Sequence, residues 1–167
     1  MIELLDIWRG FWTAAIILAG TLLGFLFVAA AIRAKECFAE ERRSNQVLLH
    51  QAITAYASVA MIGMLILMPI LTQRRLGLAI ACFGALLVVV SSWRVVSGPK
   101  DLGGLFGAVP ATPGELLAWV SYVMMAWAGV KLMRGVVHSF DWVSVAAWLL
   151  LASGMSISIQ FLRKTSA

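Results

Sequence analysis

Residues 10–32 read GFWTAAIILAGTLLGFLFVAAAI and contain no ionisable side chain. This stretch exceeds the roughly 20 residues that an α-helix needs to cross about 30 Å of hydrocarbon. Charge returns at once with Arg33, Lys35 and Glu36. Because a segment inside lipid must satisfy its own backbone hydrogen bonds, the stretch predicts a transmembrane helix that ends near Ile32.

The composition of the whole chain extends this interpretation. Of its 167 residues, 62% are hydrophobic and 13% are charged, whereas about a quarter of an average soluble domain is charged. The sequence therefore predicts an integral membrane protein with the lipid bilayer as its main partner. The net charge of +5 comes from residues scattered between apolar segments. This distribution is typical of membrane-flanking residues and does not predict nucleic-acid binding.

We predict an all-α fold, a polytopic bundle of transmembrane helices. The fourth apolar segment spans only if Lys131 and Arg134 reach outward to the interface, so the alternative is a four-helix bundle. Residues 97–115 form a loop rich in glycine and proline, lying on the membrane surface or re-entering it. The five predicted spans are residues 10–32, 47–72, 76–96, 116–137 and 142–162.

These spans make one membrane domain, residues 1–167, in the predicted organisation. With five spans, the side of residues 33–43 and the C-terminus carries more Lys and Arg than the side of Arg9. The positive-inside rule then places the N-terminus outside and the C-terminus in the cytoplasm.

Tryptophan positions agree with the predicted span ends, where amphipathic rings favour the headgroup layer. Two tryptophans lie deeper, and we expect Trp127 and Trp148 to pack between helices. The tryptophans near span ends are Trp8, Trp12, Trp93, Trp119 and Trp142.

Gly20 and Gly24 form a GxxxG pattern within the first span. Lipid supplies no hydrophobic drive for helix association, so small residues that allow close packing favour helix contacts. Two uses stay open at this point. The glycines contact another helix of the same bundle, or they form a subunit interface around a central pore.

The second span is the most polar. His50, Gln51 and Thr54 share one helical face, and a polar face is expected to turn away from lipid. It would line a polar path, relay a proton, or bind a metal or haem through His50. The other interpretation is a histidine at the interface that is bonded to a neighbour. In the fifth span, Ser153 and Ser156 would line a hydrated path or bond between helices.

Acidic residues lie at the span edges. In a ring of subunits with the first helix innermost, Glu3 and Asp6 would form an acidic mouth that concentrates cations. Their other use is to solubilise the helix end. The two cysteines, Cys37 and Cys82, have neither the number nor the spacing of a metal site, and no nucleophile stands beside a base. The sequence predicts no catalytic residues, no metal site and no cofactor, with haem at His50 as the alternative.

Two segments carry a resemblance. GTLLGFLFVAAAIR at residues 20–33 and HQAITAYASVAMIGMLILMP at residues 50–69 resemble small polytopic proteins of the bacterial inner membrane. The resemblance covers about the first 70 residues. It implies a polytopic helical fold and an inner-membrane location, and it implies no particular activity.

Three functions remain from these observations. The first is a homo-oligomeric channel or pore, cation-conducting if its acidic mouth forms. The second is a non-catalytic accessory or scaffold subunit of a larger membrane complex. The third is a haem- or metal-binding membrane protein that uses His50. The expected partners are lipid and either further copies of the chain or other membrane subunits.

Overall fold

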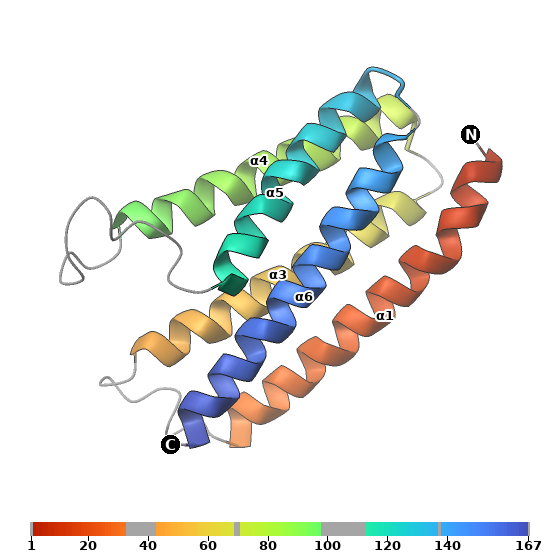
Figure 1. The fold of residues 1–167 in the computed structure, drawn as a ribbon. Helices are drawn as coiled ribbons and strands as arrows, with labels where there is room; N and C mark the ends of the chain where they lie inside the picture. The colour runs from red at the N-terminus through yellow and green to blue at the C-terminus, as the bar shows by residue number, and fades with distance from the viewer. Residues whose placement is uncertain (1, 33–42, 69–70, 98–112, 137, 167) are drawn as a thin grey trace. The chain divides into compact units, whose positions relative to one another are not determined.

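The computed structural model describes residues 2–32, 43–68, 71–97, 113–136 and 138–166. Side chains are described for these ranges except residues 2–7, 43–45, 94–97, 113 and 164–166 near the helix ends. The described part is helical and contains no strand, which confirms the all-α prediction. Its helices are α1 (Ile2–Ile32), α3 (Arg43–Leu67), α4 (Gln73–Ser97), α5 (Pro113–Met133) and α6 (Ser139–Ser166) (Figure 1).

In the described residues, five helices are long and apolar enough to cross a membrane, so the predicted five spans are confirmed by length and composition. The predicted connector at residues 33–42 and most of the loop at 97–115 lie outside the described residues. The five candidate spans are Trp8–Ile32, Gln46–Leu67, Gln73–Trp93, Gly114–Met133 and Ser139–Arg163.

Two predicted span ends were too late in the sequence. The second helix ends at Leu67 instead of residue 72, because the residue before a proline, here Met68 before Pro69, is disfavoured in the α conformation. The fourth helix ends at Met133 instead of residue 137. Gly135 has φ 83° and closes this end.

The end of α5 is a Schellman motif, which favours a glycine. The Gly135 N–H donates to the Leu132 carbonyl at 3.1 Å, and the Val136 N–H donates to the Lys131 carbonyl at 3.2 Å. These two bonds satisfy carbonyls that the helix leaves open, and the positive φ between them suits a residue without a Cβ.

The chain divides into two compact units. The first contains residues 1–70 and 150–167, and the second contains residues 71–149. The end of α6 therefore belongs to the first unit and its start to the second. The expectation of one membrane domain over residues 1–167 stays a prediction.

In the first unit, α1 packs against α3. The α1 side chains that face inward recur every three or four residues, as expected for one face of a helix. Gly63 of α3 lies against this face, where an added Cβ would come within 2.5 Å of Ile16 Cγ1. The inward residues of α1 include Trp12, Ala15, Ala19, Leu26 and Ala30.

In the second unit, α4 and α5 run side by side (Figure 1). Glycines bring their backbones into direct contact. A Cβ added at Gly77 would lie 2.7 Å from the Met133 nitrogen, and one added at Gly84 would lie 2.7 Å from the Ala126 nitrogen. Since Gly77 pairs with the end of α5 and Gly84 with its middle, the two helices are antiparallel.

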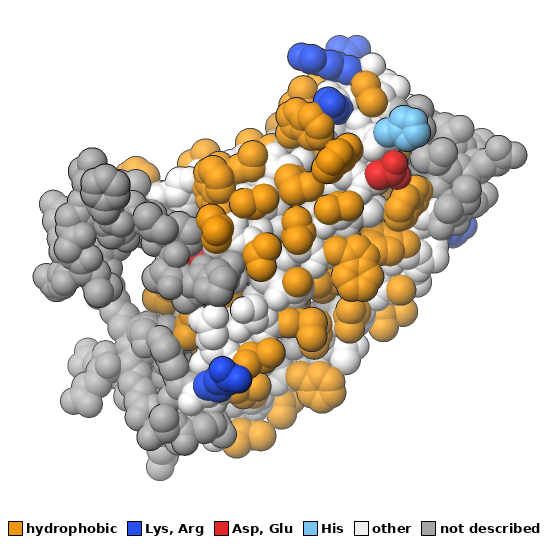
Figure 2. Space-filling model, in the orientation of Figure 1, with side chains coloured by type: hydrophobic (Ala, Val, Ile, Leu, Met, Phe, Trp, Pro, Cys, Tyr) orange, Lys and Arg blue, Asp and Glu red, His pale blue; other side chains and the backbone are white. Residues whose placement is uncertain are grey.

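The outward surfaces of the helices are apolar as well. Figure 2 shows hydrophobic side chains over the helices, with Lys and Arg near helix ends. Phe25, Val89 and Trp93 are at least 62% exposed. A protein in water would not present so many large apolar side chains, so a lipid environment accounts for this surface.

Candidate functional site

The predicted polar face of α3 makes its hydroxyl bonds within the helix. The Thr54 hydroxyl donates to the His50 carbonyl at 2.7 Å, and the Ser58 hydroxyl donates to the Thr54 carbonyl at 2.6 Å. His50 is exposed and Gln51 is half-buried. The hydroxyl protons on this face are thus directed to the backbone of α3, and the face's role as a polar path or proton relay stays a prediction.

A contact that the sequence did not predict is made by Tyr56, which lies between Thr54 and Ser58 in α3. Tyr56 is 1% exposed, and its hydroxyl lies 3.1 Å from the Ser158 hydroxyl of α6. Ser158 donates its own proton to the Gly154 carbonyl at 2.8 Å. Each hydroxyl has one proton, so Tyr56 is the donor to Ser158.

Gly154 completes this contact because its missing side chain makes room for the tyrosine ring. A Cβ added at Gly154 would lie 2.6 Å from Tyr56 Cε1. Gly154 and Ser158 are four residues apart, the small-xxx-small spacing that allows close helix contacts in membranes. That spacing is the signal by which the contact was recognisable in the sequence.

The other predicted polar residues are placed as follows. In α6, Ser153 is fully buried and Ser156 is half-buried. Glu3 and Asp6 belong to the first turns of α1, but their side chains lie outside the described part. A polar path through these residues and an acidic mouth both stay predictions.

Gly20 and Gly24 lie on the face of α1 that is turned away from its buried residues. Among the described residues, no atom comes within 4 Å of a Cβ added at either glycine, and the same holds for Gly10. Thr13 and Thr21 are also exposed, and their hydroxyls donate to the carbonyls of α1 four residues earlier, both at 2.8 Å.

These α1 residues form one continuous strip, because at 100° per residue they fall within about a third of the helix circumference. We call them the outer strip. The sequence left open a contact of Gly20 and Gly24 within the bundle. Among the described residues of the first unit, no helix makes this contact. The outer strip consists of Gly10, Thr13, Ile17, Gly20, Thr21 and Gly24.

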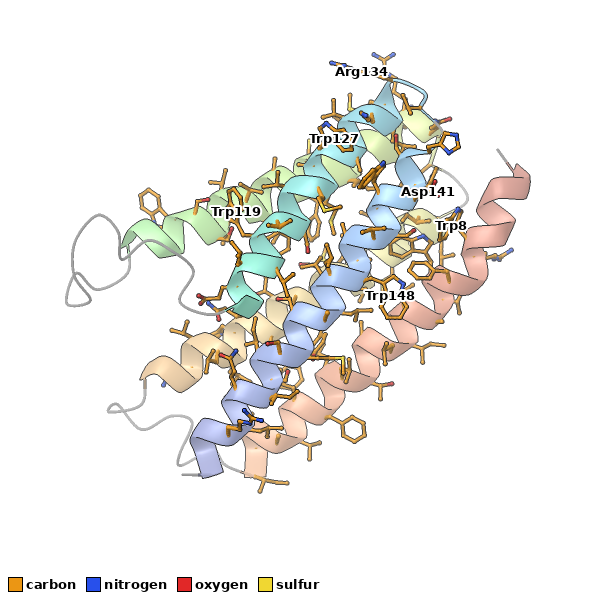
Figure 3. All side chains as sticks on the ribbon, in the orientation of Figure 1. Trp8, Trp119, Trp127, Arg134, Asp141 and Trp148 are labelled. Atoms are coloured by element: carbon orange, nitrogen blue, oxygen red, sulfur yellow. The ribbon has the colours of Figure 1, made fainter. Side chains whose placement is uncertain are left out.

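Aromatic and charged side chains gather where α5 ends and α6 begins (Figure 3). The Lys131 ammonium lies 3.9 Å from the Trp127 ring centroid. The Trp127 and Trp142 rings meet edge to face, with their centroids 5.8 Å apart. In the first turn of α6, Asp141 lies 3.6 Å from His138 Nδ1. The Lys131 ammonium therefore lies back over the indole one turn earlier in α5, and its outward reach to the interface stays a prediction.

Three tryptophans differ from their predicted positions. Trp12 is fully buried, while Trp127 is 45% and Trp148 is 57% exposed. The burial of a side chain depends on which face of the helix it occupies, and not on its position along the span. Trp12 shares the inward face of α1, whereas Trp127 lies beside exposed residues of α5.

Groups that would hold a metal ion need several donors close together. In the part of the chain that the structure describes, no three His, Cys, Asp or Glu side chains form such a group. His50 would offer one imidazole nitrogen to a haem iron, and haem at His50 stays a prediction.

A scan against protein-family models and searches of curated proteins and of solved structures find no match to this chain.

Proposed function

We propose that this chain is a non-catalytic membrane subunit that works by assembling with further copies of itself through the outer strip of α1. The observation that carries the proposal is a contrast between glycines. Five glycines of the other helices meet neighbouring atoms closely, whereas Gly10, Gly20 and Gly24 of α1 meet none among the described residues. The closely packed glycines are Gly63, Gly77, Gly84, Gly129 and Gly154.

The physical argument rests on what a glycine costs. Each one lowers helix propensity by about 1 kcal/mol relative to alanine. At Gly77 or Gly154 a close contact offsets this cost. At Gly20 and Gly24 the offsetting contact has to come from another helix, and small residues four apart are the spacing that admits a helix backbone. A second copy of α1 fits this strip because the strip is itself small and flat.

The packing inside each unit supports a function at the surface. Tyr56, Ile62 and Phe161 fill the first unit, and Met125 and Leu132 are fully buried in the second. Several buried serines direct their hydroxyl protons to carbonyls of the chain. These bonds are Ser58 to Thr54, Ser121 to Leu117, Ser139 to Val136 and Ser144 to Phe140.

Native mass spectrometry of the full-length protein released from nanodiscs tests the assembly. We expect an oligomer of identical chains for the wild type. The double variant Gly20→Leu/Gly24→Leu should shift the equilibrium towards monomer by about tenfold or more, since overpacking costs about 1–3 kcal/mol.

Ala85→Leu is the matched control, because it enlarges an exposed small residue of α4 and should leave the oligomer intact. A monomeric wild type, or equal effects of the two variants, would reject assembly through α1. A stable complex with a different protein would instead favour the accessory-subunit function.

A homo-oligomeric pore is the second candidate function. The observation that favours it is the presence of Thr13 and Thr21 on the outer strip, since a ring built around α1 would present exposed hydroxyl groups along its axis. Glu3 and Asp6 would then attract cations at one mouth.

Bilayer recordings on the purified oligomer test the pore. We expect cation-selective currents whose selectivity falls in the Glu3→Gln/Asp6→Asn variant, with Glu115→Gln as the control outside the strip. An oligomer that carries no current would reject the pore and leave the assembly proposal standing.

A further inference from the structure

Four basic side chains meet at one end of the second unit. The α4 backbone at Gly77 contacts the α5 backbone at Met133, so the start of α4 and the end of α5 lie together. Two arginines precede Gly77 by less than one turn, and two basic residues flank Met133. We call this set the basic end: Arg74, Arg75, Lys131 and Arg134.

The charge of the basic end is not compensated within the described residues. None of its four side chains has a carboxylate within 4.0 Å there. The nearby acidic residue Asp141 is directed to His138, at 3.6 Å, and both are exposed. Glu115 lies in the first turn, at the opposite end of α5. Within the described part of the chain, an excess of positive charge therefore faces the surroundings.

Two tryptophans show at what depth this charge lies. Trp127 and Trp142 are 45% and 46% exposed and touch each other edge to face. Exposed indole rings favour the boundary between hydrocarbon and headgroups. Since the Lys131 ammonium lies over the Trp127 ring, this cation and the indole share one level, which we place at that boundary. Arg134 lies about two turns beyond Trp127, past the end of α5 (Figure 3).

We propose that the basic end binds the phosphate groups of anionic phospholipids, with Trp127 and Trp142 against the glycerol and upper acyl region. Guanidinium groups donate paired hydrogen bonds to phosphate oxygens. The combination of uncompensated cations and interfacial indoles suits a lipid, because a free anion has no chain to cover the rings. This site lies outside the outer strip of α1 and does not depend on assembly.

Lipid retention by the full-length protein tests the proposal. Native mass spectrometry after graded delipidation compares phosphatidylglycerol with phosphatidylcholine. We expect the wild type to retain phosphatidylglycerol preferentially. Arg75→Gln/Arg134→Gln should weaken this retention about 25-fold, since each basic residue near an anionic surface contributes about fivefold.

Arg9→Gln/Arg163→Gln is the matched control, because it removes two exposed arginines that lie outside the basic end. We expect it to weaken retention by less than about threefold. Equal losses in the two double variants would overturn the proposal, since they would show a general surface charge effect. Displacement of phosphatidylglycerol by inorganic phosphate alone would also overturn it, because the site would then recognise a free anion.

A measurement on the wild type keeps the test valid if a variant fails to fold. Raised salt screens exposed charges, so the preference for phosphatidylglycerol over phosphatidylcholine should fall as salt increases. A preference that is absent at low salt, or that salt leaves unchanged, would contradict binding by the basic end.

Discussion

Gly129→Ala should separate α4 from α5 and destabilise the second unit by about 3 kcal/mol. An added Cβ at this position lies 2.5 Å from the Ala81 nitrogen, 2.8 Å from Ala81 Cα and 2.8 Å from the Gly77 carbonyl oxygen. All three are backbone atoms, so no side chain can turn aside. The helices must move apart, and the contacts along the pair are lost together.

Gly20→Ala, measured in detergent that keeps the chain monomeric, is the control that separates packing from helix propensity. Both substitutions favour the helix by up to about 1 kcal/mol, but no described atom lies near Gly20. Denaturing-detergent titration followed by circular dichroism should show Gly20→Ala at or above wild-type stability and Gly129→Ala well below it. Equal stability of the two variants would contradict the close approach of α4 and α5.

Tyr56→Ala should cost about 3–5 kcal/mol, the range for removing a fully buried aromatic side chain. It empties the space between α3 and the second half of α6. Tyr56→Phe keeps the ring and removes the hydroxyl that donates to Ser158 at 3.1 Å. This variant should lose only about 0.6–1 kcal/mol, as interhelical hydrogen bonds in membranes do. The same titration, followed by tryptophan fluorescence, measures both.

A double variant tests whether the ring and Gly154 share one space. Gly154→Ala alone should destabilise, because its Cβ would lie 2.6 Å from the Tyr56 ring. In Tyr56→Ala/Gly154→Ala the new methyl group enters the emptied space, so the double loss should be smaller than the sum of the single losses. Strict additivity would show that the two residues do not pack on each other.

The sequence predicted the helices well, because the requirement for about 20 apolar residues leaves a strong and local signal. Five candidate spans are present among the described residues, and the first of them covers Trp8–Ile32. The errors fall at helix ends, where single residues decide. Pro69 was assigned to the second span although a proline disfavours the helix just before it. Gly135 was assigned to the fourth, where it terminates α5.

Helix contacts were harder to predict because a glycine in an apolar segment looks the same whether it faces a neighbour or lipid. GxxxG drew attention to Gly20 and Gly24, yet the glycines that pack within the units are others, including Gly77 and Gly129. Likewise, Ser153 and Ser156 were singled out, whereas Ser158 contacts Tyr56. Pairing depends on two helices at once, and one sequence carries no direct record of which faces meet.

The glycine contacts between α4 and α5 also bear on how this pair moves. Gly77, Ala81 and Gly84 on one helix interlock with Ala126 and Gly129 on the other. Sliding by one residue would bring a side chain to a position that admits only hydrogen. The register is therefore fixed, and shear between these two helices is blocked. The α4–α5 pair should move as one rigid body. Its central amides should be among the slowest in the chain to exchange hydrogen.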